Sequence, residues 1–305
     1  MAKLVYAFAE GDGRNKQLLG GKGANLCEMT QIGINVPPGF VITTEACLEY
    51  LDAGELPESL MAEVDAEITS LEAATGRRFG GGENPLLVSV RSGSALSMPG
   101  MMDTVLNLGL NPDTLQGLIR QTNDERFAYD AYRRFIQLFG KVALGIGDEA
   151  FDEHFEAVKN AAGVASEMLL DATHLQDVSA RFLKVVRDET GRDFPVDVTE
   201  QLKLAIEAVF RSWMGKRAVD YRREFNITPD MANGTAVNNC TMVFGNMGND
   251  CATGVGFTRN PGNGDKEMFG EYLTNAQGED VVAGIRTPKP IAELASEMPE
   301  QYEQL

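Results

Sequence analysis

Cysteine and histidine are scarce in this chain of 305 residues, which has four cysteines and two histidines. The cysteines lie far apart and form no CxxC pair, so the sequence predicts neither a zinc site nor a disulfide framework. His154 and His174 lie in polar stretches of helical pattern, and no cluster of metal ligands surrounds either one. We expect both to be solvent-exposed helix residues. The ligands of any bound metal therefore stay unknown.

Long apolar runs are also missing. No stretch approaches the roughly 20 consecutive apolar residues that a membrane-crossing helix needs. The first residues have too short an apolar run, and no small-residue cleavage site, for a signal peptide. The sequence thus predicts a cytoplasmic protein that does not contact a membrane.

Positive charge is in short supply, because 27 basic residues stand against 45 acidic ones and give a net charge of −18. A surface this negative repels phosphate backbones, so we expect no nucleic-acid partner. A protein of this kind that bound a polyanion such as ATP would have to gather its few cations locally. Lysines and arginines beside glycine-rich turns are therefore the first candidates for a binding site.

One such turn lies in the segment LLGGKGANL, which contains Gly20, Gly21 and Gly23 around Lys22. Glycines let the backbone approach a ligand closely and adopt positive φ. A helix predicted over 23–32 would direct its free N–H groups at the turn, which favours an anion. The spacing G-x-x-x-x-G-K-[ST] of a Walker A loop is absent. These residues fit a phosphate-binding turn and a plain glycine turn with a solvated lysine equally well.

A second candidate is Arg91, which ends an expected strand and is followed by small hydroxylated residues in SVRSGSALSMPGMMDT. The fork of an arginine suits bidentate contact with phosphate. A surface salt bridge is the alternative role for Arg91, and filling of core gaps is the alternative for the methionines. Because SMPGMM has no helical or strand period, we favour a flexible loop that closes over a ligand.

A third candidate region begins where an apolar strand runs through Met242 and Val243 into a glycine. Backbone donors and acceptors at such a strand end can recognise a flat base, although both residues also fit a plain core position. Glu271 and Glu279 follow in the same region. Each is an acidic residue that is commonly solvated or paired with an arginine.

The pattern along the chain changes twice. Residues 1–110 mix short strands, glycine turns and helices, and residues 111–195 have helical periodicity throughout. Asp197 and Glu200 have capping-box spacing and predict the start of another helix. Strands are expected after that helix, in one small sheet, at 235–244, 254–258, 269–273 and 281–285.

Four segments together are far more specific than any one of them. GGKGANL, SVRSGSALSMPGMMDTVLNLG, TGVGFTRNP and GEYLTNAQGEDVVAGIRTP occur in this order and spacing, and the chain resembles the pyruvate, phosphate dikinase family from residue 1 to residue 305. The helical stretch, with RFAYDAYRRFIQ and AVFRSW, shares the resemblance. Alternatives are a phosphoenolpyruvate synthase, another ATP-grasp phosphotransferase, or a stand-alone nucleotide-binding module.

The resemblance implies an α+β fold, namely an ATP-grasp-like nucleotide-binding domain with an inserted helical subdomain. Its expected parts are a first lobe over 1–110, the insertion over 111–195, a return to the first lobe over 196–242, and an incomplete second lobe over 243–305. The chain ends before the acidic metal-binding strand that completes the fold in the family. It also lacks the family's GG-x-T-S-H-A motif. We therefore expect a fragment of a longer enzyme that binds ATP weakly or not at all and does not turn over alone.

The implied reaction converts ATP, pyruvate and phosphate into AMP, phosphoenolpyruvate and diphosphate through a phosphohistidine. The implied cofactors are ATP and Mg²⁺, with the metal ligands expected beyond residue 305. The implied partners are the phosphohistidine and pyruvate-binding domains of a full-length enzyme, which is expected to be a homodimer.

Carried over by position, the resemblance makes Lys22 and Arg91 the catalytic cations that hold the phosphates. The residues expected to bind the nucleotide are Gly20, Gly21, Gly100, Met101, Met102, Asp103, Thr104, Met242, Val243, Thr253, Gly254 and Glu279. Glu271 is expected to help dock the histidine domain. Cys240 stands where members of the family often have glutamine, which puts a base contact there in doubt.

Overall fold

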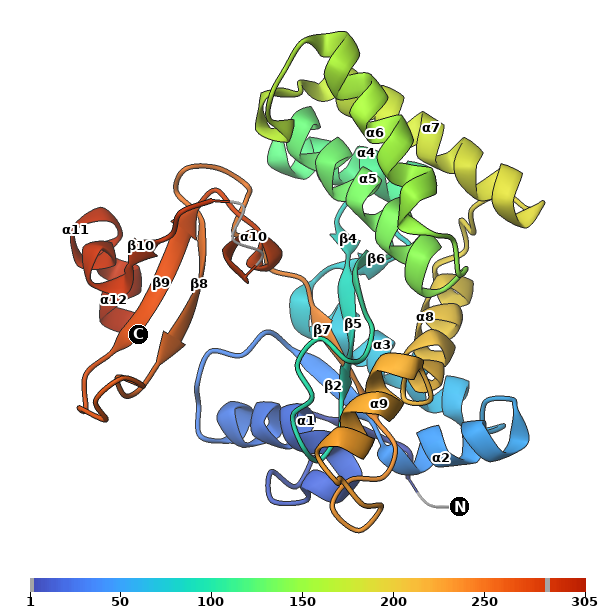
Figure 1. Cartoon of the computed structure of the whole chain (residues 1–305), viewed down its shortest axis with the longest axis vertical. Helices are drawn as coiled ribbons and strands as arrows, with labels where there is room; N and C mark the ends of the chain where they lie inside the picture. The colour runs from blue at the N-terminus through green and yellow to red at the C-terminus, as the bar shows by residue number, and fades with distance from the viewer. Residues whose placement is uncertain (1–2, 283–285) are drawn as a thin grey trace. The chain divides into compact units, whose positions relative to one another are not determined.

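The structure is a computed structural model that describes residues 3–282 and 286–305, except for the side chain of Glu279. The chain divides into two compact units, unit 1 (Met1–Met242) and unit 2 (Val243–Leu305). Helices and strands mix in both units (Figure 1), which confirms the mixed α and β character predicted from the sequence. The boundaries of the four expected parts stay a prediction.

Unit 1 is built on a five-stranded antiparallel sheet in the order β1-β2-β7-β5-β6. Its strands are β1 (Val5–Ala7), β2 (Gly39–Ile42), β5 (Val88–Gly93), β6 (Thr104–Leu108) and β7 (Ala236–Thr241). A separate parallel pair is formed by β3 (Arg78–Phe79) and β4 (Pro85–Leu86).

The central strand of this sheet, β7, comes from late in the chain. The sequence placed it in one small sheet with the strands that follow, which is wrong. Five of its six residues are buried, as is usual for a strand that is flanked on both sides and covered on both faces. It thus completes the first sheet and does not begin a new one.

The helices packed around this sheet are α1 (Lys16–Gln31), α2 (Thr44–Ala53), α3 (Leu60–Thr75), α8 (Val198–Ser212) and α9 (Lys216–Glu224). Figure 1 shows α1 and α8 on opposite sides of the sheet. The helix predicted after Asp197 is confirmed as α8, and the Asp197 carboxylate accepts a hydrogen bond of 2.9 Å from the Glu200 N–H. Such a cap satisfies one of the N–H groups that a helix start leaves free.

The first helix differs from its prediction. The sequence predicted a helix over 23–32 after a glycine turn, but α1 begins at Lys16 and carries the turn inside it. The Asn15 side chain accepts from the Leu18 N–H and starts a first helical turn. Gly20, with φ 69° and ψ 163°, then kinks the helix. Glycine alone adopts this conformation at little cost, so the turn and the helix coexist.

Four helices form a separate layer of unit 1 (green to yellow in Figure 1). They are α4 (Pro112–Thr122), α5 (Glu125–Val142), α6 (Asp148–Ala162) and α7 (Ala172–Thr190), with a short 3₁₀ turn, η1 (Glu167–Leu169), before α7. Phe151 of α6 meets Phe182 of α7 edge to face at 5.1 Å between ring centroids, a favoured geometry for aromatic pairs. The stretch is helical, as its periodicity predicts.

Unit 2 is a small three-stranded antiparallel sheet with short helices. Its elements are β8 (Ala252–Phe257), β9 (Phe269–Thr274), α10 (Gly278–Val282), β10 (Lys289–Pro290), η2 (Ile291–Glu293), α11 (Leu294–Glu297) and α12 (Pro299–Gln304). Tyr272, Leu294 and Met298 form a buried cluster on it.

The strand predicted over 281–285 is wrong for its first two residues, because Val281 and Val282 lie in α10. The remaining three lie outside the described residues. The Asp280 carboxylate accepts a hydrogen bond of 2.9 Å from the Gln277 N–H, a local bond that favours a helical turn over an extended strand.

In the described part of the chain, every helix is too short or too polar to cross a membrane.

Candidate functional site

Glycines let α1 lie directly against β5. A Cβ atom added to Gly20 would overlap the carbonyl oxygen of Gly93, so no other residue fits there. The next residue, Gly21, donates its N–H to the carbonyl oxygen of Ser94 at 2.8 Å. The close approach that the sequence predicted for these glycines is thus, at Gly20, an approach to the strand itself. This close approach brings Lys22, which follows Gly21, to the end of β5.

Lys22 and Arg91 lie within electrostatic range of each other. Lys22 belongs to α1, and Arg91 is the exposed residue of β5. Burial lowers the pKa of Lys22 below its ordinary value of 10.5, and the positive charge of Arg91 lowers it further. Among the described residues neither side chain forms a salt bridge, which removes the salt-bridge alternative for Arg91 within that set. Two unpaired cations side by side favour an anionic ligand.

A cavity of about 610 Å³, a size typical of small-molecule sites, is lined by Lys22, whereas Arg91 and Gly20 are not among its lining residues. One wall is α1, and the other is the segment that leaves β5 and enters β6. Its lining residues are Lys16, Gly21, Lys22, Asn25, Leu26 and Met29 of α1, residues 92–100, Met102 and Thr104. This lining contains two lysines and no aspartate or glutamate. In a chain of net charge −18, a carboxylate-free cavity with cations is suited to an anion.

The segment between β5 and β6 has no regular secondary structure, as predicted. Gly100 takes a positive φ of 72° and, with Met102 and Thr104, lines the cavity. Met101 and Asp103 are not among the lining residues.

The far end of this segment is tied to the helices α8 and α9. Arg217 of α9 pairs with the Asp103 carboxylate at 2.9 Å and donates to the Gly100 carbonyl oxygen at 3.3 Å. The Asp103 N–H donates to the Ser212 hydroxyl oxygen at 3.3 Å. Asp103 therefore fixes the loop from outside the cavity, and its predicted role of direct contact with a nucleotide stays a prediction.

Cys240 lies on β7 near the two cations. Burial raises the pKa of its thiol, and the charges of Arg91 and Lys22 partly oppose that rise. In the antiparallel register Cys240 is opposite Ser89, and Asn238 is opposite Arg91, so these side chains share one face of the sheet. The residue that departs from the family pattern therefore lies beside the predicted phosphate-binding cations.

The two residues predicted to face the adenine lie at the division between the units. Met242 ends unit 1, is 8% exposed, and donates its N–H to the Leu87 carbonyl oxygen at 2.8 Å. Val243 begins unit 2 and is 69% exposed. Base recognition by this pair stays a prediction.

The remaining predicted residues belong to unit 2. Thr253 and Gly254 lie on β8, opposite Leu273 and Tyr272 of β9. Glu279 falls in α10, but its side chain is outside the described residues. Glu271 is exposed on β9. These placements hold within unit 2 alone.

Sequence reasoning missed part of the site. Lys22, Asn25, Leu26 and Met29 all line the cavity, and their spacing of i, i+3, i+4 and i+7 marks one face of a helix. Asn25, Leu26 and Met29 all fall in the helix predicted over 23–32, and extending that helix by one residue to Lys22 would have revealed the shared face. No local pattern in the sequence marks Asn238 as part of the site, because the residues that it meets are set by the register of β7 with β2 and β5.

The donors at this cavity do not fit a resident divalent metal. Mg²⁺ prefers carboxylate oxygens, and the lining offers hydroxyl, amide and backbone oxygens only. Within residues 3–282 and 286–305, apart from the Glu279 side chain, no group of three or more histidine, cysteine, aspartate or glutamate residues could hold a metal. The location of the metal ligands beyond residue 305 stays a prediction.

Taken together, a glycine-kinked helix, an antiparallel sheet and a cavity lined by two lysines and no carboxylate form a unit of mixed α and β structure whose cavity is suited to an anion. Residues 16–73 and 54–299 match the family described as "Pyruvate phosphate dikinase, AMP/ATP-binding domain". Since these matches cover most of the chain, the chain belongs to this family. The resemblance seen in the sequence motifs is confirmed.

Individual relatives agree with this assignment. The chain is 60% identical to a pyruvate, phosphate dikinase of Entamoeba histolytica over 99% of this chain and 34% of that protein. It is 49% identical to the enzyme of Clostridium symbiosum over 100% of this chain and 35% of that protein. It is 51% identical to a chloroplastic pyruvate, phosphate dikinase of Mesembryanthemum crystallinum over 99% of this chain and 32% of that protein. The chain thus spans about a third of the length of these relatives.

Proposed function

We propose that this chain is the ATP-binding portion of a pyruvate, phosphate dikinase. The complete enzyme would convert ATP, pyruvate and phosphate into AMP, phosphoenolpyruvate and diphosphate through a phosphohistidine supplied by another domain. The fold would be ATP-grasp-like, with residues 111–195 inserted into a first lobe and residues 243–305 contributing to a second. Family membership and the order of the motifs support this assignment.

The observation that carries the proposal is a cavity without carboxylates that Lys22 lines, with Arg91 close enough to Lys22 to lower its pKa. In this role the two side chains bind the polyphosphate and neutralise the charge that develops on the transferred group. Gly100, Met102 and Thr104 contact the phosphates from the opposite wall. Mg²⁺, when bound with the nucleotide, supplies further neutralisation of phosphate charge.

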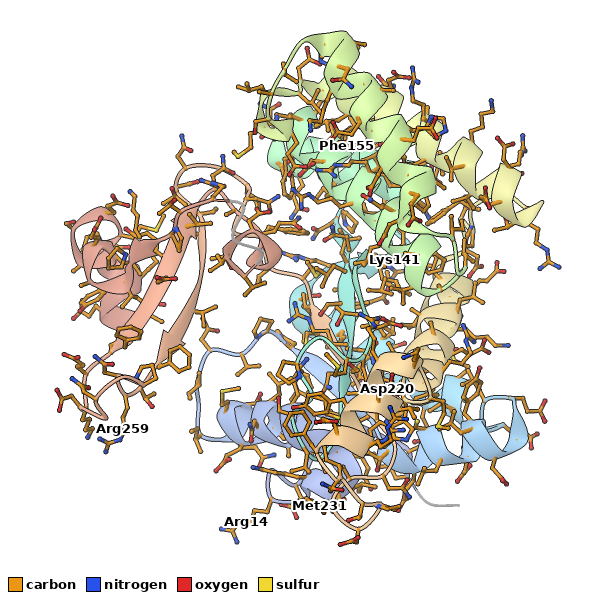
Figure 2. All side chains as sticks on the ribbon, viewed as in Figure 1. Arg14, Lys141, Phe155, Asp220, Met231 and Arg259 are labelled. Carbon is orange, nitrogen blue, oxygen red and sulfur yellow. The ribbon has the colours of Figure 1, made fainter. Side chains whose placement is uncertain are left out.

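Calorimetric titration with ATP, AMP and diphosphate tests the proposal. This chain is expected to bind ATP weakly or not at all, so the variants are tested in a form extended by a few dozen residues. We expect that form to bind ATP and diphosphate, and Lys22→Ala and Arg91→Ala each to weaken both by about 10- to 100-fold, as is usual for a charge-assisted bond. Arg14→Ala is the matched control, because Arg14 precedes α1 and points away from unit 1 (Figure 2). Equal affinity in all three variants of the extended form, or no binding by its unsubstituted version, would contradict the proposal.

A further inference from the structure

We infer that Asn238 is a positioning residue of this site, whose buried carboxamide lies between Gly23 of α1 and Gly93 of β5 and so fixes Lys22 relative to Arg91. That ATP is the ligand of this site rests on the proposed function. The geometry does not, because it concerns contacts inside unit 1 alone.

Asn238 lies at the middle of the sheet, on β7. In the antiparallel register it is opposite Arg91 on β5 and opposite Val41 on β2. Its side chain is fully buried, with 0% exposure. Strand alternation directs it to the face where Arg91 and Cys240 lie. The same face receives α1, because atoms of Asn238 and Val41 lie closest to Gly23 of that helix.

The carboxamide fills the gap between two glycines. A Cβ atom at Gly23 would lie 2.8 Å from Oδ1 of Asn238, and a Cβ atom at Gly93 would lie 2.7 Å from its Nδ2. Gly23 directly follows Lys22, and Gly93 comes two residues after Arg91. The amide is therefore in contact with both segments that carry the cations, and its width sets the distance between Gly23 and Gly93.

Hydrogen bonding supports a role beyond filling space. Nδ2 donates to the carbonyl oxygen of Arg91 at 3.3 Å, which ties the amide to the strand at the position of the cation. Oδ1 is buried without a hydrogen-bond partner among the described residues. An apolar side chain would fill the gap without burying an unsatisfied acceptor. The bond to Arg91 gives a reason for an amide here.

The neighbouring residue of β7 provides a matched control. Asn239 is also an asparagine and is also 0% exposed. It points to the opposite face of the sheet, away from α1, and neither of its side-chain polar atoms has a partner in the described part of the chain. Truncating either residue opens a cavity of the same size, but only one of them faces the cations.

Two measurements on the complete chain separate positioning from stability. The pKa of Lys22 can be followed by NMR of ¹³C-methylated lysines, and ATP affinity by calorimetry. The charged and titratable groups around Lys22 are Arg91 on β5, Cys240 on β7, and Lys16, which lines the same cavity. We expect Asn238→Ala to raise the pKa of Lys22 towards 10.5, because the lysine gains water and distance from Arg91. We also expect about a 10-fold loss of ATP affinity.

Asn239→Ala should lower the thermal midpoint and leave both quantities unchanged. An unchanged Lys22 pKa in Asn238→Ala, or equal effects of the two asparagine variants, would overturn the inference. The comparison of pKa values needs no nucleotide, so it decides the role of Asn238 even if the unsubstituted chain fails to bind ATP.

A double-mutant cycle with Gly93→Ala provides a second test in case Asn238→Ala does not fold. The new Cβ in Gly93→Ala meets Nδ2 of Asn238, and Asn238→Ala removes that atom. We expect the double variant to fold and to bind ATP more tightly than Gly93→Ala alone, with a Lys22 pKa closer to that of the unsubstituted chain. Strictly additive effects, or a double variant less stable than Gly93→Ala, would refute a spacing role.

Discussion

The surroundings of Lys22 oppose a positive charge on its side chain. Burial and the nearby Arg91 both lower its pKa, so the folded chain binds a proton at Lys22 less readily than the unfolded chain does. Between the folded-state pKa and 10.5, stability therefore rises as pH rises, because the unfavourable charge is lost. A bound anion acts in the opposite sense, since it favours the protonated lysine.

The affinity for ATP should consequently fall as pH rises through the lowered pKa of Lys22. Calorimetry from neutral pH up to 10.5, the ordinary lysine value, measures this fall. Lys22→Met should bind about 10- to 100-fold more weakly at neutral pH, as for loss of a charged hydrogen bond, and should lose most of the pH dependence. Lys184→Met, at an exposed position on α7, is the control that should keep it. A Lys22→Met profile parallel to that of the unsubstituted chain would assign the titration to another group.

At the residue scale, the sequence reveals some parts of the site and hides others. Lys22 and Arg91 each stand close to glycines, and a cation beside a glycine-containing turn can be recognised from the sequence alone. Asn238 cannot be recognised from the sequence, because its partner Arg91 is 147 residues away along the chain. Its role follows from the register of β7 between β2 and β5, which no local pattern specifies.

The helix α5 carries a buried ionic cluster of a kind that periodicity does not predict. Oδ1 of Asp130 lies 2.7 Å from Arg133, Oδ2 lies 3.0 Å from Arg134, and Glu167 pairs with both arginines. Burial acts to raise the pKa of Asp130, but the two guanidinium groups outweigh it and hold the pKa below 3.8. The resulting stability is present above 3.8 and is lost as pH falls through the folded-state pKa.

Asp130→Asn should therefore lower the free energy of unfolding at neutral pH by about 3 kcal/mol, because the buried Arg133 loses one of its two carboxylate partners and keeps the partly exposed Glu167. That arginine, Arg133, also stacks on Phe155 of α6 at 4.7 Å, and Figure 2 shows Phe155 within the helical layer. Urea unfolding followed by tryptophan fluorescence measures the change. Asp177→Asn breaks an exposed pair with Arg181 and should cost about 0–1 kcal/mol. Similar losses in the two variants would show that burial does not decide the effect.

At the scale of elements, strong periodicity predicts α5 and α8 well, and local exceptions cause the errors. A glycine inside α1 looks like a helix start because its positive φ is not visible in the sequence. Val281 and Val282 suggest a strand by their branching, yet the hydrogen bond from Gln277 to Asp280 selects a turn of helix. In both cases one residue's backbone geometry outweighs the average preference of its neighbours.

The whole chain is divided unequally, because unit 2 contains only about 60 residues and unit 1 contains the rest. Among the described residues, the buried apolar ones of unit 2 are Tyr272, Leu273, Ala276, Ile291, Leu294 and Met298, and all the others belong to unit 1. A domain of about 60 residues buries a smaller share of its surface than a large one and is correspondingly less stable. The two units should therefore not unfold together.

Urea titration should show unit 2 unfolding at a lower concentration than unit 1. The single tryptophan, Trp213, is buried in unit 1, so its fluorescence follows that unit alone. Hydrogen exchange measured by mass spectrometry follows both, and the amides of β8 and β9 should lose protection before those of β5 and β7. The strands are all hydrogen-bonded in sheets, so the difference would come from the size of the core beneath them. Coincident loss of protection in all four strands would mean that the chain unfolds as one cooperative unit, and that the small core of unit 2 does not limit its stability.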